Sequence, residues 1–462
     1  MKQIKLTLED VFNIPGAVIY NPDSYEDVTS VSIDSRKIKK RSLFIAIKGD
    51  RFDGHDFINT AVKKGAKAVM INRNQLKNLD DLLISIITVP DTIKALGYVA
   101  KVWRSKLKAK VIGLTGSTGK TTTKEILAAL LSQKYSVNKS VANNNNHIGV
   151  PLTILSTSAN HEVLVAECGT NHFGEIAYTA DILQPDYALI TNIGDSHLEY
   201  LKNRNGVLKE KSALLKVTSQ RKGKIFINAD DKLINNHSKN FKNKIKYAFD
   251  SNADVKGKIL SFDSLVRANL EVKSKSQKVN LTIPLPGQSG AQNFLAASAI
   301  GFEMGLTSTQ IKKAVKKIKS PAKRIKINIF KSFTILDDTY NANPDSMRAA
   351  ISILSLYKNR RRKIAILGDM FELGDQSQKL HESLADFVSI HNIHEVFTTG
   401  KMMKFFAARL KSKGTLVEHF ESKELLKKYL KKINLFNSVI LVKGSRGMKM
   451  EEFIPVIETR AD

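Results

Sequence analysis

The chain has 462 residues, of which 42% are hydrophobic and 25% are charged, a balance typical of globular domains with packed cores. At about 150 residues per domain, this length predicts three domains. The single cysteine, Cys168, excludes an intramolecular disulfide, and no apolar run approaches the ~18 residues of a membrane span. The N-terminal segment MKQIKLTLEDVF lacks the apolar core of a signal peptide, so we expect a cytoplasmic protein.

The charge is unusual, because 73 Lys and Arg residues face 44 Asp and Glu residues, for a net charge of +29. Binding to nucleic acid is one interpretation. However, many lysines form pairs on the polar sides of helical patterns, such as Lys312-Lys313 and Lys427-Lys428, where a solvated face explains them. Aromatic residues make up only 7% and do not alternate with the basic clusters. A positive field that attracts a small anionic substrate fits equally well, and we expect no nucleic-acid partner.

The N-terminal region contains short strand-like runs, such as residues 42–47 (SLFIAI), and helical ones, such as residues 57–64. From about residue 109 the pattern changes to a regular alternation of strands and helices. We therefore expect a first domain at residues 1–108. The alternation that follows predicts a parallel sheet covered by helices.

Residues 110–124 read KVIGLTGSTGKTTTK and form the most informative segment of the chain. A β-branched pair leads into a glycine-rich turn that opens a helical stretch, so backbone N–H groups and a helix N-terminus would face an anion. Lys120 can reach the β- and γ-phosphates, and the Thr121 hydroxyl can ligate Mg²⁺. The usual spacing places a glycine where this chain has Leu114, and a plain strand–helix turn with a surface lysine is the alternative. We expect a nucleoside triphosphate to contact the whole loop: Thr115, Gly116, Ser117, Thr118, Gly119, Lys120, Thr121 and Thr122.

Polar side chains follow the next two predicted strands. The run at residues 163–166 ends on Glu167, and the run at residues 187–193 precedes His197. Ligand sites in open α/β sheets lie at the carboxyl ends of strands, so both side chains are candidates for a Mg²⁺ site beside the loop. Taken singly, Glu167 could also be a surface residue. Cys168 is more simply a packed thiol than a ligand, because Mg²⁺ prefers oxygen.

A lysine-rich helical stretch begins at Ile311, and Pro321 is expected to stop it. This stop predicts a central domain at residues 109–320 and a third domain at residues 321–462. Four strand-like runs follow, each ending in polar residues or glycine: residues 333–336, 363–367, 396–399 and 438–442.

Several strings of the central region resemble the middle domain of the Mur ligases: TGSTGKTT, NNNNHIGVPLTIL, VAECGTNHFGEI, TNIGDSHLEYL and VLKEKSALL. The compact G-x-x-G-K-T loop of that family explains Leu114. The resemblance continues into the third domain with LDDTYNANPDSMRAAI, LGDMFELGDQSQKLH and LVKGSRGMKME, and into the first with SIDSRKIKKRSLFIAIKGDRFDGHDFI. The string YNANPDSM is the most specific, because sister ligases carry a histidine-containing version.

The resemblance implies an α/β protein of three domains: a small α/β nucleotide-sugar-binding domain, a central P-loop parallel-sheet ATPase domain and a C-terminal Rossmann-like α/β domain. It implies an ATP-dependent carboxylate–amine ligase that joins D-alanyl-D-alanine to UDP-N-acetylmuramoyl-tripeptide through an acyl phosphate and releases ADP and phosphate. The product would be the pentapeptide precursor of peptidoglycan, and the enzyme is expected to be a monomer. Two alternatives stay open: a folylpolyglutamate-synthetase-like ligase and a basic P-loop ATPase that binds nucleic acid.

The resemblance also assigns roles to residues. Lys120 would hold the terminal phosphates, Thr121 and Glu167 one Mg²⁺, and His197 a second. Lys211 falls where the family has a carbamylated lysine that stabilises the second metal, and Lys209 is a competing choice.

The remaining assignments concern the nucleotide and the substrates. Further ATP contacts by resemblance are Asn293, Arg324 and Asp338. Two departures weaken this part: Ser289-Gly290 replaces the family His-Asn before Asn293, and Lys323 replaces a glycine. Asn146 is a substrate contact implied by the resemblance. The third domain would deliver Tyr340, Asn341 and Asn343, together with Asp338, to the ATP and the dipeptide. The candidates for the diphosphate and uridine are Ser35, Arg36, His55 and Asp56. A simple turn explains residues 34–36 equally well.

Overall fold

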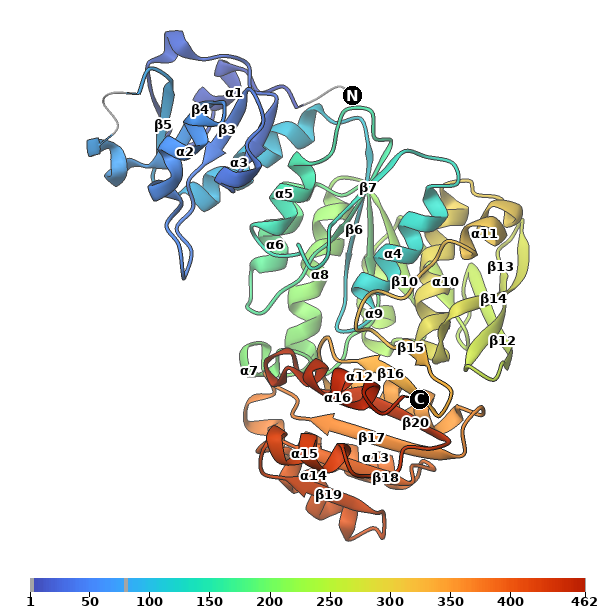
Figure 1. The fold of residues 1–462 in the computed structure, drawn as a ribbon. Coiled ribbons are helices and arrows are strands. Elements are labelled where there is room, and N and C mark those ends of the chain that lie inside the picture. The colour runs from blue at the N-terminus through green and yellow to red at the C-terminus, as the bar shows by residue number, and fades with distance from the viewer. Residues whose placement is uncertain (1–3, 79–81, 462) are drawn as a thin grey trace.

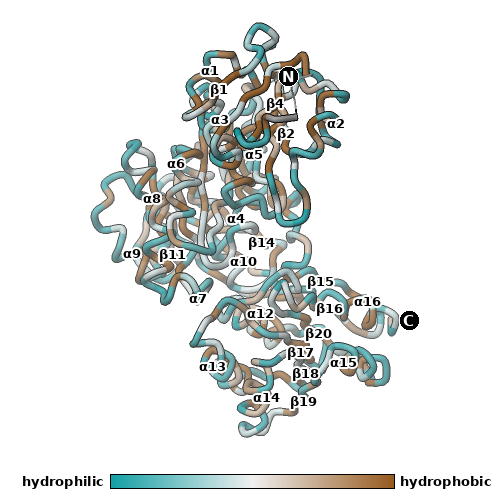
Figure 2. The backbone as a smooth tube through the Cα atoms, turned by 90° about the vertical axis from the view of Figure 1, so that its left-hand side faces the viewer, coloured by the Kyte–Doolittle hydropathy of each residue, from teal (hydrophilic) through white to brown (hydrophobic). Residues whose placement is uncertain are grey.

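Each of the three regions builds its own β-sheet in the computed structural model, which describes residues 4–78 and 82–461. The central region lies between the other two (Figure 1). Hydrophobic segments concentrate inside each region, and hydrophilic ones follow the outer loops (Figure 2). The three-domain α/β class expected from the sequence is confirmed. Within the described part of the chain, no helix is long and apolar enough to cross a membrane.

The first sheet has five strands, and all neighbours are parallel except the β1–β5 pair. In spatial order they are β1 (Val18–Tyr20), β5 (Ser85–Val89), β4 (Ala66–Asn72), β3 (Ser42–Ile45) and β2 (Ser30–Ser32). The helices of this region are α1 (Leu8–Phe12), α2 (Ile58–Lys63) and α3 (Thr92–Lys106). Helix α3 starts at Asp91, whose carboxylate accepts the N–H groups of Ile93 and Lys94. Its Trp103 donates to the carbonyl of Thr157, which ties the first region to the central one.

The central sheet has nine strands. In spatial order they are β14 (Lys278–Pro286), β13 (Arg267–Lys273), β12 (Val255–Phe262), β11 (Lys244–Ala248), β10 (Lys224–Asn228), β9 (Tyr187–Ile190), β6 (Lys110–Thr115), β8 (Val163–Glu167) and β7 (Val137–Lys139). The pairs from β12 to β7 are parallel, as expected. The sequence interpretation missed the edge, where β12, β13 and β14 form antiparallel hairpins.

Helices cover both faces of this sheet, because neighbouring residues of its strands are buried on opposite sides. On β6, Val111 packs in one core, whereas Ile112 and Leu114 pack in the other. One face carries α4 (Lys120–Leu131), α10 (Gly287–Glu303) and α11 (Ser308–Val315), and the other carries α5 (Gly149–Leu155), α6 (Glu175–Leu183) and α8 (Arg204–Gln220). Short helices α7 (Leu198–Leu201) and α9 (Lys232–His237) follow strand ends.

Helix α11 corrects one expectation, because it ends at Val315 and not at Pro321. The chain turns after Lys316, and this turn returns Ile318 to the same core that holds Ile311. The proline therefore follows a turn and does not itself stop the helix.

The third sheet has six strands, parallel except for the β15–β16 pair. In spatial order they are β15 (Lys326–Ile329), β16 (Phe333–Asp338), β20 (Ser438–Lys443), β17 (Arg362–Gly368), β18 (Glu395–Thr399) and β19 (Val417–Phe420). One face carries α12 (Pro344–Leu356), α13 (Ser377–Ser389) and α14 (Met403–Lys411), and the other carries α15 (Lys423–Leu430) and α16 (Phe453–Glu458).

Short 3₁₀-helices complete the description: η1 (Pro22–Ser24), η2 (Ser35–Lys37), η3 (Gly54–Phe57), η4 (Arg73–Asn78), η5 (Ser238–Asn240), η6 (Gly374–Gln376), η7 (Arg446–Met448) and η8 (Met450–Glu452).

Candidate active site

A cavity of about 620 Å³ opens where the carboxyl ends of the central parallel strands face the third region. Its lining comes from both regions: Lys120 and Glu167 from the central one, and Asp338 and Lys443 from the third. Strand ends predicted from the sequence therefore meet in one place, as the topology of parallel sheets requires.

The loop between β6 and α4 has the geometry of a phosphate cradle. Gly116 (φ 152°) and Gly119 (φ 78°) adopt backbone conformations that other residues avoid. A Cβ on Gly119 would lie 2.3 Å from Asn293 Oδ1, so the second glycine is also required by close packing. Lys120 Nζ donates to the carbonyl of Gly116 at 2.7 Å, and burial lowers its pKa. Of the other predicted loop residues, Ser117, Thr118 and Thr122 line the cavity.

Asn192, which the sequence interpretation missed, fixes the loop from the side. Its Oδ1 accepts the N–H of Thr118 at 3.0 Å, and its Nδ2 donates to the Thr118 hydroxyl at 2.8 Å. The neighbouring Thr191 hydroxyl donates to the carbonyl of Thr118 at 2.6 Å. The position of Asn192, a polar residue just after the buried strand β9, could have identified it from the sequence.

Glu167 ends β8 with both carboxylate oxygens engaged. Oε2 accepts from the Thr121 hydroxyl at 2.8 Å, and Oε1 accepts from the Asn145 amide at 2.9 Å. The structure therefore brings together Thr121 and Glu167 as expected, and adds Asn145. Asn146 instead accepts the N–H of Gly149, the first residue of α5, at 2.8 Å. Its substrate contact stays a prediction.

A buried lysine holds the asparagine loop in place. Lys124 on α4 is fully buried, and its Nζ donates to the carbonyls of Ser140 at 2.7 Å and Ala142 at 3.0 Å. The Ser140 hydroxyl in turn accepts the N–H of Glu167 at 3.1 Å. Burial lowers the pKa of Lys124, and Glu167 opposes that shift. Sequence reasoning missed this residue, because its partners lie 16 and 18 positions away.

Lys211 is the inward-facing lysine of α8. It is fully buried, and its Nζ has no hydrogen-bond partner. Burial lowers its pKa well below the ordinary value, and the nearby charge of Lys120 adds to this effect. The competing Lys209 instead lies over the ring of Phe173, 5.7 Å from its centre. A buried, partnerless amine fits modification to a carbamate, since a neutral amine is the form that reacts with carbon dioxide.

His197 lies in the left-handed region (φ 53°), and its Nδ1 is 2.6 Å from Glu372 Oε2 of the third region. The described residues contain no group of three or more His, Cys, Asp or Glu side chains that could hold a metal ion. Thr121, Glu167 and His197 could therefore bind Mg²⁺ only together with oxygens from a nucleotide or from a modified Lys211. Burial raises the pKa of Cys168 to about 12, so this thiol stays protonated and is a poor ligand.

The third region contributes a second polar cluster. Asp338 forms a 2.5 Å ion pair with the buried Lys443, which also donates to the carbonyl of Asn341 at 2.9 Å. The guanidinium of Arg324 lies 4.1 Å from the centre of the Tyr340 ring. All five side chains border the cavity, and Lys443 was not among the residues expected from the sequence.

Two predicted asparagines have structural partners as well. Asn343 lines the cavity and caps α12 by accepting the N–H of Ser346 at 2.9 Å. Asn293 Oδ1 accepts the Thr123 hydroxyl at 3.2 Å, and Ser289 and Gly290 border the same cavity. The segment that departs from the family pattern therefore lies beside the phosphate loop.

The four predicted residues of the first region do not line this cavity. Ser35 is buried, and Arg36 pairs with Asp34 within the same turn. His55 Nδ1 lies 2.6 Å from Asp53 Oδ1, and its Nε2 accepts the N–H of Asn72 at 3.0 Å. Asp56 is exposed. Binding of a nucleotide sugar by Ser35, Arg36, His55 and Asp56 stays a prediction.

Three family models match the chain in sequence: the Mur ligase family catalytic domain at residues 27–104, the Mur ligase middle domain at residues 114–301 and the Mur ligase glutamate ligase domain at residues 323–446. A UDP-N-acetylmuramoyl-tripeptide–D-alanyl-D-alanine ligase of Bacillus subtilis is 34% identical, and the match covers 98% of each chain. The chain belongs to the Mur ligase family.

Solved structures agree with this assignment. A MurF structure from Acinetobacter baumannii superposes with a TM-score of 0.89 at 28% identity, and the match covers 99% of this chain and all of that one. MurF from Thermotoga maritima, in complex with ADP, has a TM-score of 0.81 at 27% identity, with 94% and 98% covered. The Mur ligase described here is thus an enzyme of the ligase class with the three-domain architecture of its relatives.

Proposed function

We propose that this Mur ligase joins D-alanyl-D-alanine to UDP-N-acetylmuramoyl-tripeptide and consumes ATP. The relatives matched over the full chain carry this activity in their names, and the T. maritima relative binds ADP. One structural observation carries the proposal: the cavity that contains the phosphate loop is shared with the string YNANPDSM, which supplies Tyr340, Asn341 and Asn343 to its wall.

The residues around the cavity suit phosphoryl transfer to a carboxylate. The γ-phosphate passes to the terminal carboxylate of the tripeptide, giving an acyl phosphate, and the amine of the dipeptide then displaces phosphate. Lys120 exchanges its bond to the Gly116 carbonyl for phosphate oxygens and neutralises the charge that develops there. Because the enzyme's main contribution is alignment and charge neutralisation, no strong general base is required.

Mg²⁺ would be held by Thr121 and Glu167, with a second ion at His197 and a carbamylated Lys211. Bound there, the ion neutralises phosphate oxygens and aligns them for transfer. Support comes from the donor types and from the partnerless Lys211 amine, which a carbamate would convert into an oxygen ligand. Arg324, Asp338 and Asn293 complete the nucleotide pocket in this proposal.

We also propose a role for each domain and a cytoplasmic location. Residues 1–108 bind the nucleotide sugar through Ser35, Arg36, His55 and Asp56, residues 109–320 bind ATP, and residues 321–462 close over both. A chain that works as a monomer on ATP and a nucleotide-linked substrate would act in the cytoplasm.

Product analysis tests the proposal. The protein is incubated with ATP, Mg²⁺ and D-alanyl-D-alanine, and UDP-N-acetylmuramoyl-tripeptide, the corresponding dipeptide and a folate are offered side by side. We expect mass spectrometry to find the pentapeptide product only. Glutamylated folate would favour the folylpolyglutamate alternative, and ATP turnover that DNA or RNA stimulates without a peptide would favour the nucleic-acid alternative.

A further inference from the structure

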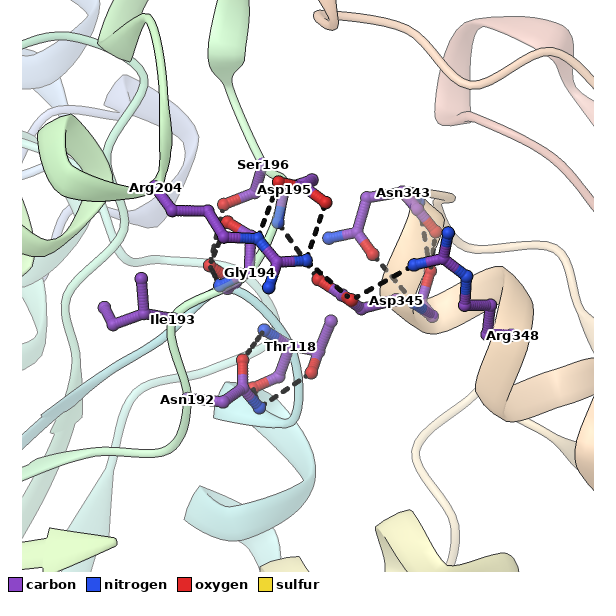
Figure 3. A network of polar contacts seen from close by, with 12 residues as sticks. Thr118, Asn192, Ile193, Gly194, Asp195, Ser196, Arg204, Asn343, Asp345 and Arg348 are labelled. Carbon is purple, nitrogen blue, oxygen red and sulfur yellow. Dashed lines mark hydrogen bonds and ion pairs between the residues drawn. The ribbon is translucent and has the colours of Figure 1, made fainter. Parts of the chain in front are cut away.

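The junction between the central and third regions is held by a carboxylate near the start of α12 (Figure 3). Asp345 Oδ2 accepts the N–H of Asp195 at 3.0 Å, across 150 positions of sequence. Asp195 is itself paired with Arg204 through two hydrogen bonds of 2.8 and 2.7 Å. The same guanidinium approaches Asp345 Oδ1 at 3.5 Å, and Arg348 approaches it from its own helix at 4.0 Å.

We propose that Asp345 is a positioning residue that couples docking of the third domain to the shape of the phosphate loop. The role presupposes the ligase reaction proposed above, since it acts on the site of phosphoryl transfer. Asp345 itself does not border the cavity, so it acts through the segment of residues 192–197 that it contacts.

That segment forms the opposite wall of the phosphate loop. The Ser117 hydroxyl accepts the N–H of Gly194 at 2.9 Å and lies 2.9 Å from the hydroxyl of Ser196. Asn192, two residues before Gly194, accepts the N–H of Thr118. A displacement of Gly194 or Asp195 therefore moves the partners of the loop that would hold the phosphates.

Gly194 shows how closely the third domain docks. A Cβ on Gly194 would lie 1.9 Å from Asp345 Oδ2, whereas its next nearest neighbour outside Asp345, the Cβ of Ser117, would be 3.5 Å away. The backbone of Gly194 is not in the left-handed region, so alanine fits the central domain by itself. The missing side chain at this position makes room for the Asp345 carboxylate.

Other contacts cross the same junction and end on His197 or on residues that follow it. The carbonyl of Glu372 accepts the N–H of Glu199 at 3.1 Å, and its carboxylate reaches His197. Gln376 donates to the carbonyl of Lys202 at 3.3 Å. Docking of the third domain thus fixes both sides of the turn that carries His197.

Two substitutions break the Asp345 contact from opposite sides. Asp345→Leu keeps the approximate size of the side chain but removes both acceptor oxygens, and Gly194→Ala pushes the intact carboxylate away. Asp386→Leu is the matched control, because Asp386 pairs with Arg409 inside the third domain and away from the junction. Each variant, the double variant and the wild type are compared in turnover, ADP binding by calorimetry and small-angle X-ray scattering.

We expect each single variant to lose roughly tenfold in kcat, the range for a hydrogen bond to a charged group, with a smaller change in the ADP dissociation constant. The double variant should lose no more than the single ones, because both remove one contact. The radius of gyration without ligand should increase in all three and stay unchanged in the control.

The proposal would be overturned if the double variant lost the product of the two single losses in kcat. It would also be overturned if both single variants had the radius of gyration of the wild type. Equal loss of ADP affinity and of kcat would also overturn it, since it would indicate general damage to the central domain. Failure of the wild type to make pentapeptide would count against the ligase reaction alone, because the scattering comparison does not depend on turnover.

Discussion

At the scale of single residues, burial distinguishes Lys211 from Lys209 as the candidate for the carbamylated lysine. A fully buried ammonium group without a partner is costly, whereas the amine over the Phe173 ring at Lys209 stays near solvent. Formation of a carbamate would give the buried amine a role and supply oxygens where the described residues contain no group of three His, Cys, Asp or Glu side chains for a metal.

Lys211→Ala should reduce kcat by roughly 100-fold or more, because loss of a metal-supporting anion removes charge neutralisation at the transferring phosphoryl group. A short carboxylic acid added to the assay should restore part of the rate by replacing the carbamate. Lys209→Ala is the matched control and should keep near-normal activity. A Lys211→Ala enzyme as active as wild type would contradict the modification.

The family resemblance and the positions of strand ends predicted residues that belong to a short sequence motif or end a strand, such as Lys120, Thr121 and Glu167. The partners that orient them were not predictable. Asn145 and Lys443 meet their partners across 22 and 105 positions, and sequence spacing carries no information on such contacts. These partners become visible only once the fold brings distant strand ends together.

At the scale of elements, the loop of residues 140–146 depends on one side chain of α4. Lys124 bonds two of its carbonyls, and the loop delivers Asn145 to Glu167. Helix α4 therefore contributes three side chains to the site. Lys120 lines the cavity, Thr121 donates to Glu167, and Lys124 supports the loop that carries Asn145.

Lys124→Met keeps the approximate length of the side chain but removes the donor to the carbonyls of Ser140 and Ala142. We expect roughly a tenfold loss of kcat and a higher Mg²⁺ concentration at half-maximal rate, because Glu167 loses its fixed orientation. Lys139→Met, which removes a partly exposed partner of Glu125, is the control. Unchanged Mg²⁺ dependence in Lys124→Met, with only thermal stability lowered, would reduce Lys124 to a packing role.

The sequence pattern also predicted elements unequally. Strands such as β9 and β20 are continuous apolar runs buried on both faces, and such runs are easy to recognise. The hairpins of β12, β13 and β14 lie at the sheet edge and mix polar and buried positions, as in the alternating burial of β13. These strands share a core with α10 and α11, and the sequence pattern does not reveal this packing.

For the whole molecule, the net charge of +29 has a measurable consequence. The nucleotide-linked substrate carries a diphosphate and carboxylates, whereas D-alanyl-D-alanine is a zwitterion. We expect kcat/KM for the nucleotide-linked tripeptide to fall more steeply with ionic strength than kcat/KM for the dipeptide, because salt screens long-range attraction. Steady-state rates over a range of KCl concentrations, with the other substrate saturating, measure both slopes. Equal slopes would mean that the excess lysine forms only a solvated surface.

The buried thiol of Cys168 makes the chain suited to fluorescence experiments. It is the only cysteine in the sequence, and its raised pKa and burial protect it from maleimide dyes in the folded state. Cysteines introduced at exposed positions of two domains, for example in place of Lys63 and Lys411, could therefore be labelled without removing the native one. Energy transfer between the dyes would then follow the distance between the first and third domains during single turnovers.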